Sequence, residues 1–177
     1  MAKNSMLQIE EDERKILEEL STNANKSINE IAKTCRFSRQ KVWRVIKNLE
    51  KNNTIWGYVA VIDEEKQGKQ GYVILIKRTN KPLENDLIDK IIHRVLQKKS
   101  DTRKVQIINS IYTNGIFDWV ICFNAHDMKE AKRFVEEVNK LFFGYISEIY
   151  LLEKMFNIES CGIDNPEKEK LRDFFSF

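Results

Sequence analysis

The stretch from Ser38 to Tyr58, SRQKVWRVIKNLEKNNTIWGY, combines two patterns that decide the architecture of the chain. On a helical wheel its apolar residues gather on one side and its polar and basic residues on the other. The apolar side consists of Val42, Val45, Ile46 and Leu49. The opposite side consists of Gln40, Arg44, Lys47 and Lys51, with Trp43 on the flank and Arg39 in the first turn. The first pattern therefore predicts an amphipathic helix with a basic outer face, capped at its start by the Ser38 hydroxyl.

Two shorter helical patterns precede this helix, and a β-like run follows it. One face of the first is marked by Ile9, Glu13, Ile16, Leu17 and Leu20. The second opens with Ser27 and Glu30, the spacing of a capping box. After Asn52 and Asn53 the run TIWGYVAVID is rich in β-branched and aromatic residues, which is typical of strands. Three helices followed by a hairpin predict a winged helix-turn-helix, in which Trp56 and Tyr58 are expected to pack against the helices. The alternative is that this wing contacts a minor groove, although it carries no Arg or Lys.

The remainder of the chain follows a second pattern. Strands are expected over 72–78, 105–113, 118–125 and 146–156, and apolar stripes predict helices within 83–96 and 128–142. This order is the ferredoxin-like β-α-β-β-α-β arrangement, in which both helices cover one face of a four-stranded antiparallel sheet. We therefore expect an α+β protein with a winged helix-turn-helix domain at 1–63, a linker at 64–71, a ferredoxin-like domain at 72–156 and a C-terminal extension at 157–177.

The first strand of the second domain is apolar on both faces. Tyr72, Ile74 and Ile76 alternate with Val73 and Leu75, so helices on one side of the sheet leave apolar side chains on the other. This pattern predicts a homodimer that packs sheet against sheet.

Composition and cysteine usage narrow the function classes. With 42% hydrophobic and 32% charged residues, no apolar run reaches the length of a membrane span, and the N-terminus lacks a signal-peptide pattern. A cytoplasmic protein is expected. Cys35, Cys122 and Cys161 are far apart, and His93 and His126 form no ligand pair. We therefore expect no metal site, no cofactor and no catalytic residue.

Charge is distributed unevenly along the chain. The formal net charge is only +3, but residues 10–20 hold six acidic and two basic residues, whereas 33–51 hold seven basic residues and one acidic residue. Such a local concentration of cations is typical of a surface that contacts phosphates. The alternative is an amphipathic helix whose basic face is only solvated, although an exposed Trp43 among cations argues against it.

A helix-turn-helix places its second helix in the major groove, with the N-terminal residues of that helix near base edges. Arg39 and Arg44 could then bind guanine bidentately, and Gln40 could bind adenine. Lys41, Lys47, Lys51 and the Ser38 hydroxyl suit phosphate groups. The predicted DNA-binding residues are Ser38, Arg39, Gln40, Lys41, Trp43, Arg44, Lys47 and Lys51.

The segment from Asp12 to Gly68 resembles the N-terminal half of the Lrp/AsnC transcription regulators. The matching positions are Asp12, Arg14, Ile16 and Leu17; Asn23 and Ala24; Ile31 and Ala32; Ser38, Val42, Arg44, Leu49 and Glu50; Ile55, Gly57 and Tyr58; and Gly68. The resemblance implies a sequence-specific regulator that binds two-fold related sites in double-stranded DNA as a homodimer or higher homo-oligomer and is not an enzyme. Arg36 departs from the pattern, because the family commonly has a turn glycine there.

The second half resembles the effector-binding and assembly domain of the same family, more loosely. Gly115 and Asp118 fit its Gly-x-x-Asp segment, which implies an effector site for an amino acid or another small molecule at Asn114, Gly115, Ile116, Phe117 and Asp118. The alternative is that Asn114 and Gly115 only form a hairpin turn. The C-terminal residues, with Leu171, Phe174 and Phe175, could form a short helix for an oligomer contact or fray.

The sequence is also compatible with two other functions. Siroheme decarboxylases resemble this family in fold, and a site of that kind would need histidines such as His93 or His126 around a large pocket. A module that senses a small molecule and acts through protein partners would share the second domain. It would differ only in lacking a DNA partner.

Overall fold

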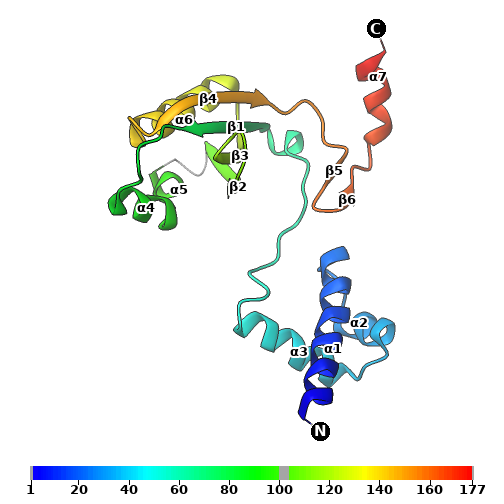
Figure 1. Ribbon diagram of the computed structural model, residues 1–177. Helices are drawn as coiled ribbons and strands as arrows, with labels where there is room; N and C mark the ends of the chain where they lie inside the picture. The colour runs from blue at the N-terminus through cyan, green and yellow to red at the C-terminus, as the bar shows by residue number, and fades with distance from the viewer. Residues whose placement is uncertain (1, 100–103, 177) are drawn as a thin grey trace. The chain divides into compact units, whose positions relative to one another are not determined.

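The computed structural model describes residues 2–99 and 104–176 and divides into two compact units. Unit 1 comprises Met1–Val61 and Glu159–Pro166, and unit 2 comprises Ile62–Ile158 and Glu167–Phe177. The two units are described separately below, with element labels as in Figure 1. Within the described ranges, no helix combines the length and the apolar character that crossing a membrane requires.

Unit 1 is built on three helices, as the sequence predicts. They are α1 (Ala2–Thr22), α2 (Ile28–Cys35) and α3 (Arg39–Lys51). The capping box at the start of α2 is present: the Ser27 Oγ accepts from the Glu30 amide at 3.2 Å, and the Ser27 amide donates to the Glu30 carboxylate at 2.7 Å. The buried side chains between the helices are Ile16, Ile31, Ala32 and Val42.

The turn between α2 and α3 passes through Arg36, which has φ +56°. This left-handed conformation brings the Arg36 amide to the Lys33 carbonyl (3.3 Å) and the Phe37 amide to the Ala32 carbonyl (2.9 Å). The two bonds satisfy carbonyls that the end of α2 leaves free. The turn thus has the backbone of a glycine turn with an arginine in it.

The hairpin predicted for residues 54–63 is wrong. This segment is extended but joins no sheet among the described residues, and Trp56 is 95% exposed. The expectation that Trp56 packs against the helices is therefore wrong as well. Tyr58 remains half-exposed, and its hydroxyl donates to Glu50 of α3 at 3.2 Å. The physical reason is that a strand needs a neighbour for its backbone groups, and Gly57, the one glycine of the run, does not adopt a left-handed turn conformation there.

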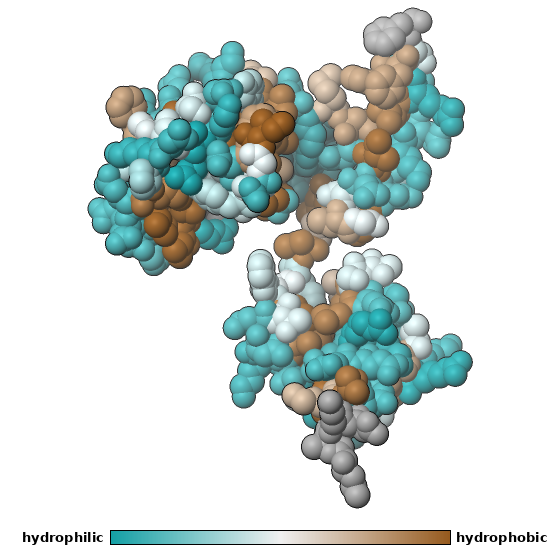
Figure 2. Space-filling view, in the orientation of Figure 1, coloured by the Kyte–Doolittle hydropathy of each residue, from teal (hydrophilic) through white to brown (hydrophobic). Residues whose placement is uncertain are grey.

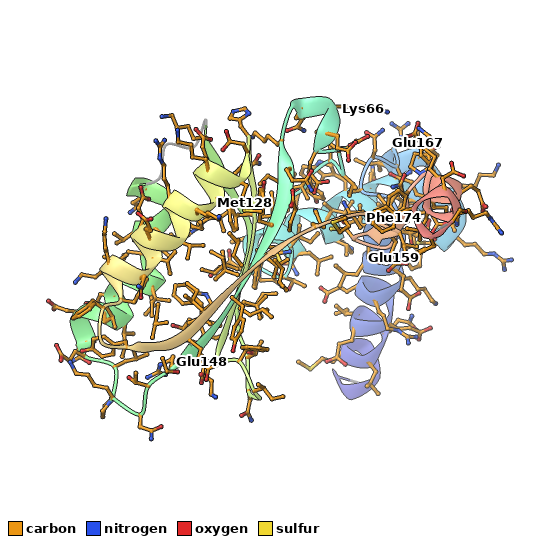
Figure 3. The ribbon with its side chains drawn as sticks, turned by 90° about the horizontal axis from the view of Figure 1, so that it is seen from above. Lys66, Met128, Glu148, Glu159, Glu167 and Phe174 are labelled. Carbon is orange, nitrogen blue, oxygen red and sulfur yellow. The ribbon has the colours of Figure 1, made fainter. Side chains whose placement is uncertain are left out.

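Unit 2 contains the predicted four-stranded antiparallel sheet. Its strands are β1 (Gln70–Arg78), β2 (Val105–Tyr112), β3 (Trp119–Ala125) and β4 (Ile146–Glu153), in the order β2-β3-β1-β4. The helices are α4 (Asn85–Ile92), α5 (Val95–Lys99) and α6 (Met128–Leu141). Figure 3 shows α4 and α6 on the same side of the sheet. The α+β, ferredoxin-like prediction is confirmed.

Alternation along the central strands separates the two faces of the sheet. Tyr72, Ile74 and Ile76 of β1 are buried in the core that the helices cover, and they lie opposite Phe123, Ile121 and Trp119 of β3. Val73 and Leu75 point to the other face and are only half-buried. Figure 2 shows hydrophobic residues among hydrophilic ones on the surface that this view presents.

Two elements differ from the predicted pattern. The single helix expected within 83–96 is interrupted at Arg94, whose φ of +55° ends one helical run before α5 begins. In the C-terminal extension, β5 (Glu159–Ser160) and β6 (Ile163–Asp164) form a hairpin around Cys161 and Gly162, both of which have positive φ. A short helix, α7 (Leu171–Phe175), follows.

The segment that leads into β1 is tied to the end of β4. The Lys154 ammonium pairs with the Glu64 carboxylate, which also accepts from the Asn157 side chain at 3.0 Å. A Cβ atom on Gly71 would overlap the Lys154 side chain. The absence of a side chain at Gly71 therefore leaves room for the Lys154 side chain. Glu64 in turn begins the 3-10 turn Glu65–Gln67, because its carbonyl accepts from the Gln67 and Lys69 amides, both at 3.0 Å.

Candidate nucleic-acid interface

The N-terminus of α3 is fixed by its cap. Ser38 has an extended backbone (φ −74°, ψ 150°), and its hydroxyl accepts a hydrogen bond from the Lys41 amide at 3.2 Å. Val42 and Leu49 are fully buried, and Val45 and Ile46 are half-buried. The rotation of the helix about its axis is therefore determined, and with it the set of side chains that face solvent.

Four of the predicted DNA-binding side chains are exposed and engaged with no other group in the described residues. They are Arg39, Gln40, Arg44 and Lys51. Arg39, Gln40 and Arg44 lie in the first two turns of α3, whereas Lys51 lies at its end. Two guanidinium groups and one amide near a helix N-terminus are the donors that base edges and phosphates accept.

Lys41 is placed differently from the other cations. Its ammonium lies 2.5 Å from an Asp12 carboxylate oxygen and 3.9 Å from the centre of the Phe37 ring. Asp12 is 6% exposed and also accepts from Gln8 at 3.3 Å. Burial raises the pKa of Asp12, but the hydrogen bonds from Lys41 and Gln8 outweigh it, so that the pKa lies below its usual range. Lys41 thus joins α1 to the first turn of α3, and its phosphate contact stays a prediction.

Lys47 belongs to a small surface network. Its ammonium lies 2.7 Å from Glu50, which also accepts from Tyr58. The hydrogen bond between them raises the pKa of Lys47 and lowers that of Glu50. Because the pair is exposed, a phosphate could displace Glu50 at small cost.

The residues around the start of α3 form an open groove on unit 1. Its lining consists of Ile28, Ser38, Arg39, Gln40, Lys41, Trp43 and Arg44. Six of these seven residues belong to the predicted DNA-binding set, so the structure brings most of that set together. Ile28, at the start of α2, was not predicted and adds an apolar side chain.

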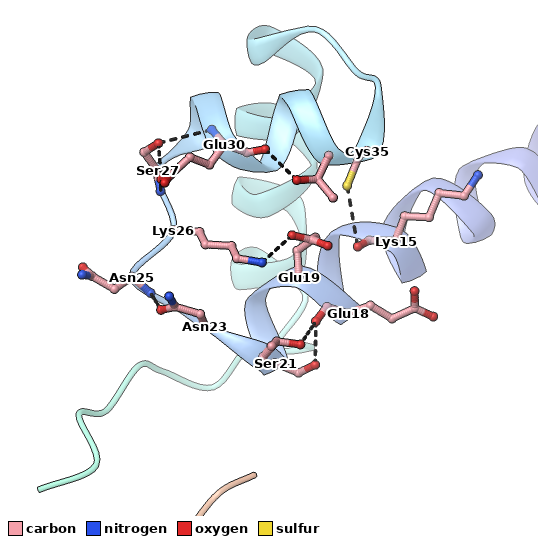
Figure 4. A network of polar contacts seen from close by, with 12 residues as sticks. Lys15, Glu18, Glu19, Ser21, Asn23, Asn25, Lys26, Ser27, Glu30 and Cys35 are labelled. Atoms are coloured by element: carbon pink, nitrogen blue, oxygen red, sulfur yellow. Dashed lines mark hydrogen bonds and ion pairs between the residues drawn. The ribbon is translucent and has the colours of Figure 1, made fainter. Parts of the chain in front are cut away.

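Contacts between α1 and α2 support this surface (Figure 4). The Lys26 ammonium lies 2.7 Å from Glu19 of α1, and the Cys35 thiol lies 3.7 Å from the Lys15 carbonyl. Burial raises the pKa of the Cys35 thiol, which fits a packed side chain. These contacts fix the position of α1 and α2, the two helices against which α3 packs.

Asp12 is the functional residue that the sequence reasoning did not assign. The sequence includes it only among the positions that match the family, although one further signal is present. Asp12 lies four residues before Ile16, on the buried stripe of α1. A carboxylate on an apolar face needs a partner, and the adjacent basic helix offers one.

The segment 114–118, predicted to bind an effector, forms the loop between β2 and β3. Neither Asn114 nor Gly115 has a positive φ, so the two residues do not form the Asn-Gly hairpin turn considered as the alternative. The Asp118 carboxylate accepts from the Arg78 amide at 2.8 Å, and its own amide donates to the Ile76 carbonyl at 2.9 Å. Asp118 therefore orders the end of β1, and Ile116 projects into solvent.

The two histidines lie apart from this loop. A ring nitrogen of His93 lies 2.8 Å from the Asp89 carbonyl, and one of His126 lies 2.9 Å from the Gly68 carbonyl. Across residues 2–99 and 104–176, no group of three or more metal-ligating side chains is assembled.

Comparison with known proteins shows which families and structures this chain resembles. Residues 13–55 match a family described as winged helix-turn-helix DNA-binding. An AsnC family transcriptional regulator from Agrobacterium tumefaciens has a similar structure, with a TM-score of 0.63 and 19% identity, covering 84% of this chain and 92% of that one. The chain has the fold of the Lrp/AsnC regulators. The resemblance drawn from the sequence is thereby confirmed for the DNA-binding domain and for the fold.

Two further proteins are similar to this chain. The HTH-type transcriptional regulator YugG of Bacillus subtilis is 27% identical over 133 residues, which cover 74% of this chain and 76% of YugG. A transcriptional regulator of Neisseria meningitidis, crystallised as a complex with L-Met, gives a TM-score of 0.63 at 17% identity and covers 84% of this chain and 91% of that one.

Proposed function

We propose that this protein is a sequence-specific transcription regulator that binds two-fold related DNA sites through α3 as a homodimer or higher homo-oligomer. The observation that carries the proposal is the exposed set Arg39, Gln40 and Arg44, which has no side-chain partner among the described residues and lies on the first turns of a capped helix. This helix belongs to the segment that matches a winged helix-turn-helix DNA-binding family. The opposite side of α3 is buried, so these side chains face outward. Base edges in a major groove accept the donors they offer.

Selection of bound fragments from random-sequence DNA, at one fixed salt concentration, tests this function. The expected result is a palindromic consensus whose half-sites are spaced by about one helical turn or a multiple of it. Arg44→Ala should weaken binding by about 1–3 kcal/mol and relax the preference at one position of each half-site. Recovery of unselected sequences would contradict a sequence-specific function, and recovery of no DNA would exclude it.

The second face of the sheet supports the homodimer. Val73 and Leu75 of β1 lie beside Val120 and Cys122 of β3 on the face that the helices leave open. Burying such a face against a second copy removes apolar surface from water and joins two copies of α3 in one assembly.

An amino-acid effector is the remaining part of the proposal. The regulator from Neisseria meningitidis was crystallised with L-Met. The loop 114–118 is the place to search in this chain, because the family resemblance of Gly115 and Asp118 implies an effector site there. Thermal unfolding in the presence of each free amino acid tests it. An effector present at 100 times its Kd should add about 2.7 kcal/mol to the free energy of unfolding. If no amino acid stabilises the protein, the amino-acid effector is excluded and the proposed DNA-binding function is unaffected.

A further inference from the structure

Trp43 is an exposed aromatic side chain without an aromatic or cationic partner among the described residues. It is 54% exposed on the second turn of α3. Trp119 of unit 2 shows the contrast: it is 4% exposed, stacks on Tyr112 and donates its Nε1–H to Ser110 at 2.9 Å. Trp119 therefore belongs to the core of unit 2, whereas most of the Trp43 side chain is exposed to water.

The surroundings of Trp43 combine apolar and polar groups. Trp43 lines the open groove together with Ile28, and the same groove holds Arg39, Gln40 and Arg44. Arg39 precedes Trp43 by four residues and Lys47 follows it by four, so cations flank it along the same face of α3. A ligand for this groove must offer an apolar group between hydrogen-bond acceptors and negative charges.

The major groove of DNA contains one such apolar group. The C5-methyl group of thymine is the only hydrocarbon group that the four standard bases present there, and it lies beside the O4 acceptor. We propose that Trp43 contacts a thymine C5-methyl group in each half-site and thereby contributes to sequence specificity. This inference rests on the proposed function, because it requires α3 to enter the major groove.

Replacing thymine with uracil tests the contact, because the exchange removes the methyl group and leaves base pairing unchanged. Each thymine of the selected site is replaced in turn, and the Kd is measured at fixed salt. At one position per half-site, wild-type protein should bind the uracil site about fourfold more weakly, the effect of burying one methyl group. A 5-methylcytosine·guanine pair at that position should bind more tightly than cytosine·guanine does.

Variants assign the effect to Trp43. Trp43→Ala should bind thymine and uracil sites equally, and Trp43→Phe should retain part of the difference. Trp56→Ala is the matched control, because Trp56 is a more exposed tryptophan outside α3; it should keep the full difference. Since both tryptophans are exposed, these substitutions are compatible with folding, which the cooperative unfolding of each variant verifies.

The outcomes separate the inference from the function beneath it. A defined DNA site that wild-type protein binds equally well with uracil at every position would overturn the thymine contact and leave the regulator function standing. Persistence of the difference in Trp43→Ala would overturn it as well. Absence of any selected DNA would overturn the function itself and the contact with it.

Discussion

Asp12 and Lys41 form an ion pair that joins α1 to the first turn of α3. The carboxylate is buried, and two side chains donate to it. Removing it leaves Lys41 without its anion and the Gln8 amide without its acceptor. Hydrogen bonds to charged groups contribute about 1.5–3 kcal/mol each, so this contact is a sizeable part of the stability of a small unit.

Asp12→Asn should lower the free energy of unfolding by about 1–3 kcal/mol at pH 7, measured by chemical denaturation. The pKa of Asp12 is lowered in the folded protein, so the contribution is complete above the ordinary carboxyl pKa of about 4. It is lost as the pH falls through the lowered value. The difference between wild type and Asp12→Asn should therefore shrink below about pH 4.

Glu11→Gln provides the control for this substitution. Glu11 belongs to the same helix and pairs with Lys15 at 2.8 Å, but both side chains are exposed. Exposed ion pairs contribute about 0–1 kcal/mol. Equal losses for the two variants would show that the buried position of Asp12 is irrelevant.

Arg36 carries backbone strain, because its φ of +56° disfavours a residue with a Cβ atom. Arg36→Gly should raise the free energy of unfolding by about 0.5–1 kcal/mol, which is the relief of strain less the extra freedom of glycine in the unfolded chain. Lys33→Gly, inside α2, should instead destabilise by about 1 kcal/mol. Thermal unfolding of both variants checks this, and a loss of stability in Arg36→Gly would contradict it.

At the scale of one element, some cationic side chains of α3 form ion pairs and others have no ion-pair partner among the described residues. Lys51 is exposed and unpaired among the described residues, whereas Lys41 is held by Asp12. Lys51→Ala should reduce the slope of log Kd against log salt by about 1, since each phosphate contact contributes about 0.9 to that slope. Lys41→Met should in addition lower the free energy of unfolding, because it leaves the buried Asp12 carboxylate without its cation. Identical slopes for wild type and Lys51→Ala would exclude a phosphate contact at Lys51.

The segment before β1 depends on Lys154, the residue that follows β4. Lys154→Met should break the pair with Glu64 and loosen the turn at 65–67. Loss of about 1 kcal/mol would speed amide exchange of Gln67 and Lys69 about fivefold. Lys77→Met removes an exposed pair with Glu148 and should leave these two amides unchanged. Equal exchange in both variants would mean that Lys154 does not hold the turn.

At the scale of the whole molecule, the open face of the sheet predicts a dimer. Light scattering at micromolar concentration should give at least twice the mass of the 21.0 kDa chain. Leu75→Asp should convert this species to a monomer, because it places a charge among the apolar side chains of that face. Ile92→Asp, on the exposed side of α4, should leave the mass unchanged. A wild-type monomer would contradict the proposed assembly.

The fold was predictable wherever the sequence repeats a local pattern. The stripe Val42, Val45, Ile46 and Leu49 determined α3, and the capping box at Ser27 determined the start of α2. Alternation along β1 determined which side chains enter the core. Each of these features is set by neighbours within a few residues, so periodicity alone reveals it.

The features that escaped prediction depend on contacts between distant residues. The state of the segment 54–63 depends on whether another strand is available, which composition does not reveal. In the candidate site, the exposed positions of α3 followed from its phase, but the engagement of Lys41 by Asp12 joins residues 29 positions apart. A helical wheel predicts the side of the helix on which a side chain lies, but it does not predict which residue that side chain contacts.

The three tryptophans of the chain lie in three different environments, and this gives the protein its own optical reporters. Trp119 is shielded in the core, Trp56 is almost fully in water, and Trp43 stands among cations. Iodide, an anionic quencher, should therefore quench the emission of Trp43 most strongly at low salt, and that of Trp119 least. Fluorescence quenching could thus follow occupancy of α3 and unfolding of the sheet separately, without any label attached to the protein.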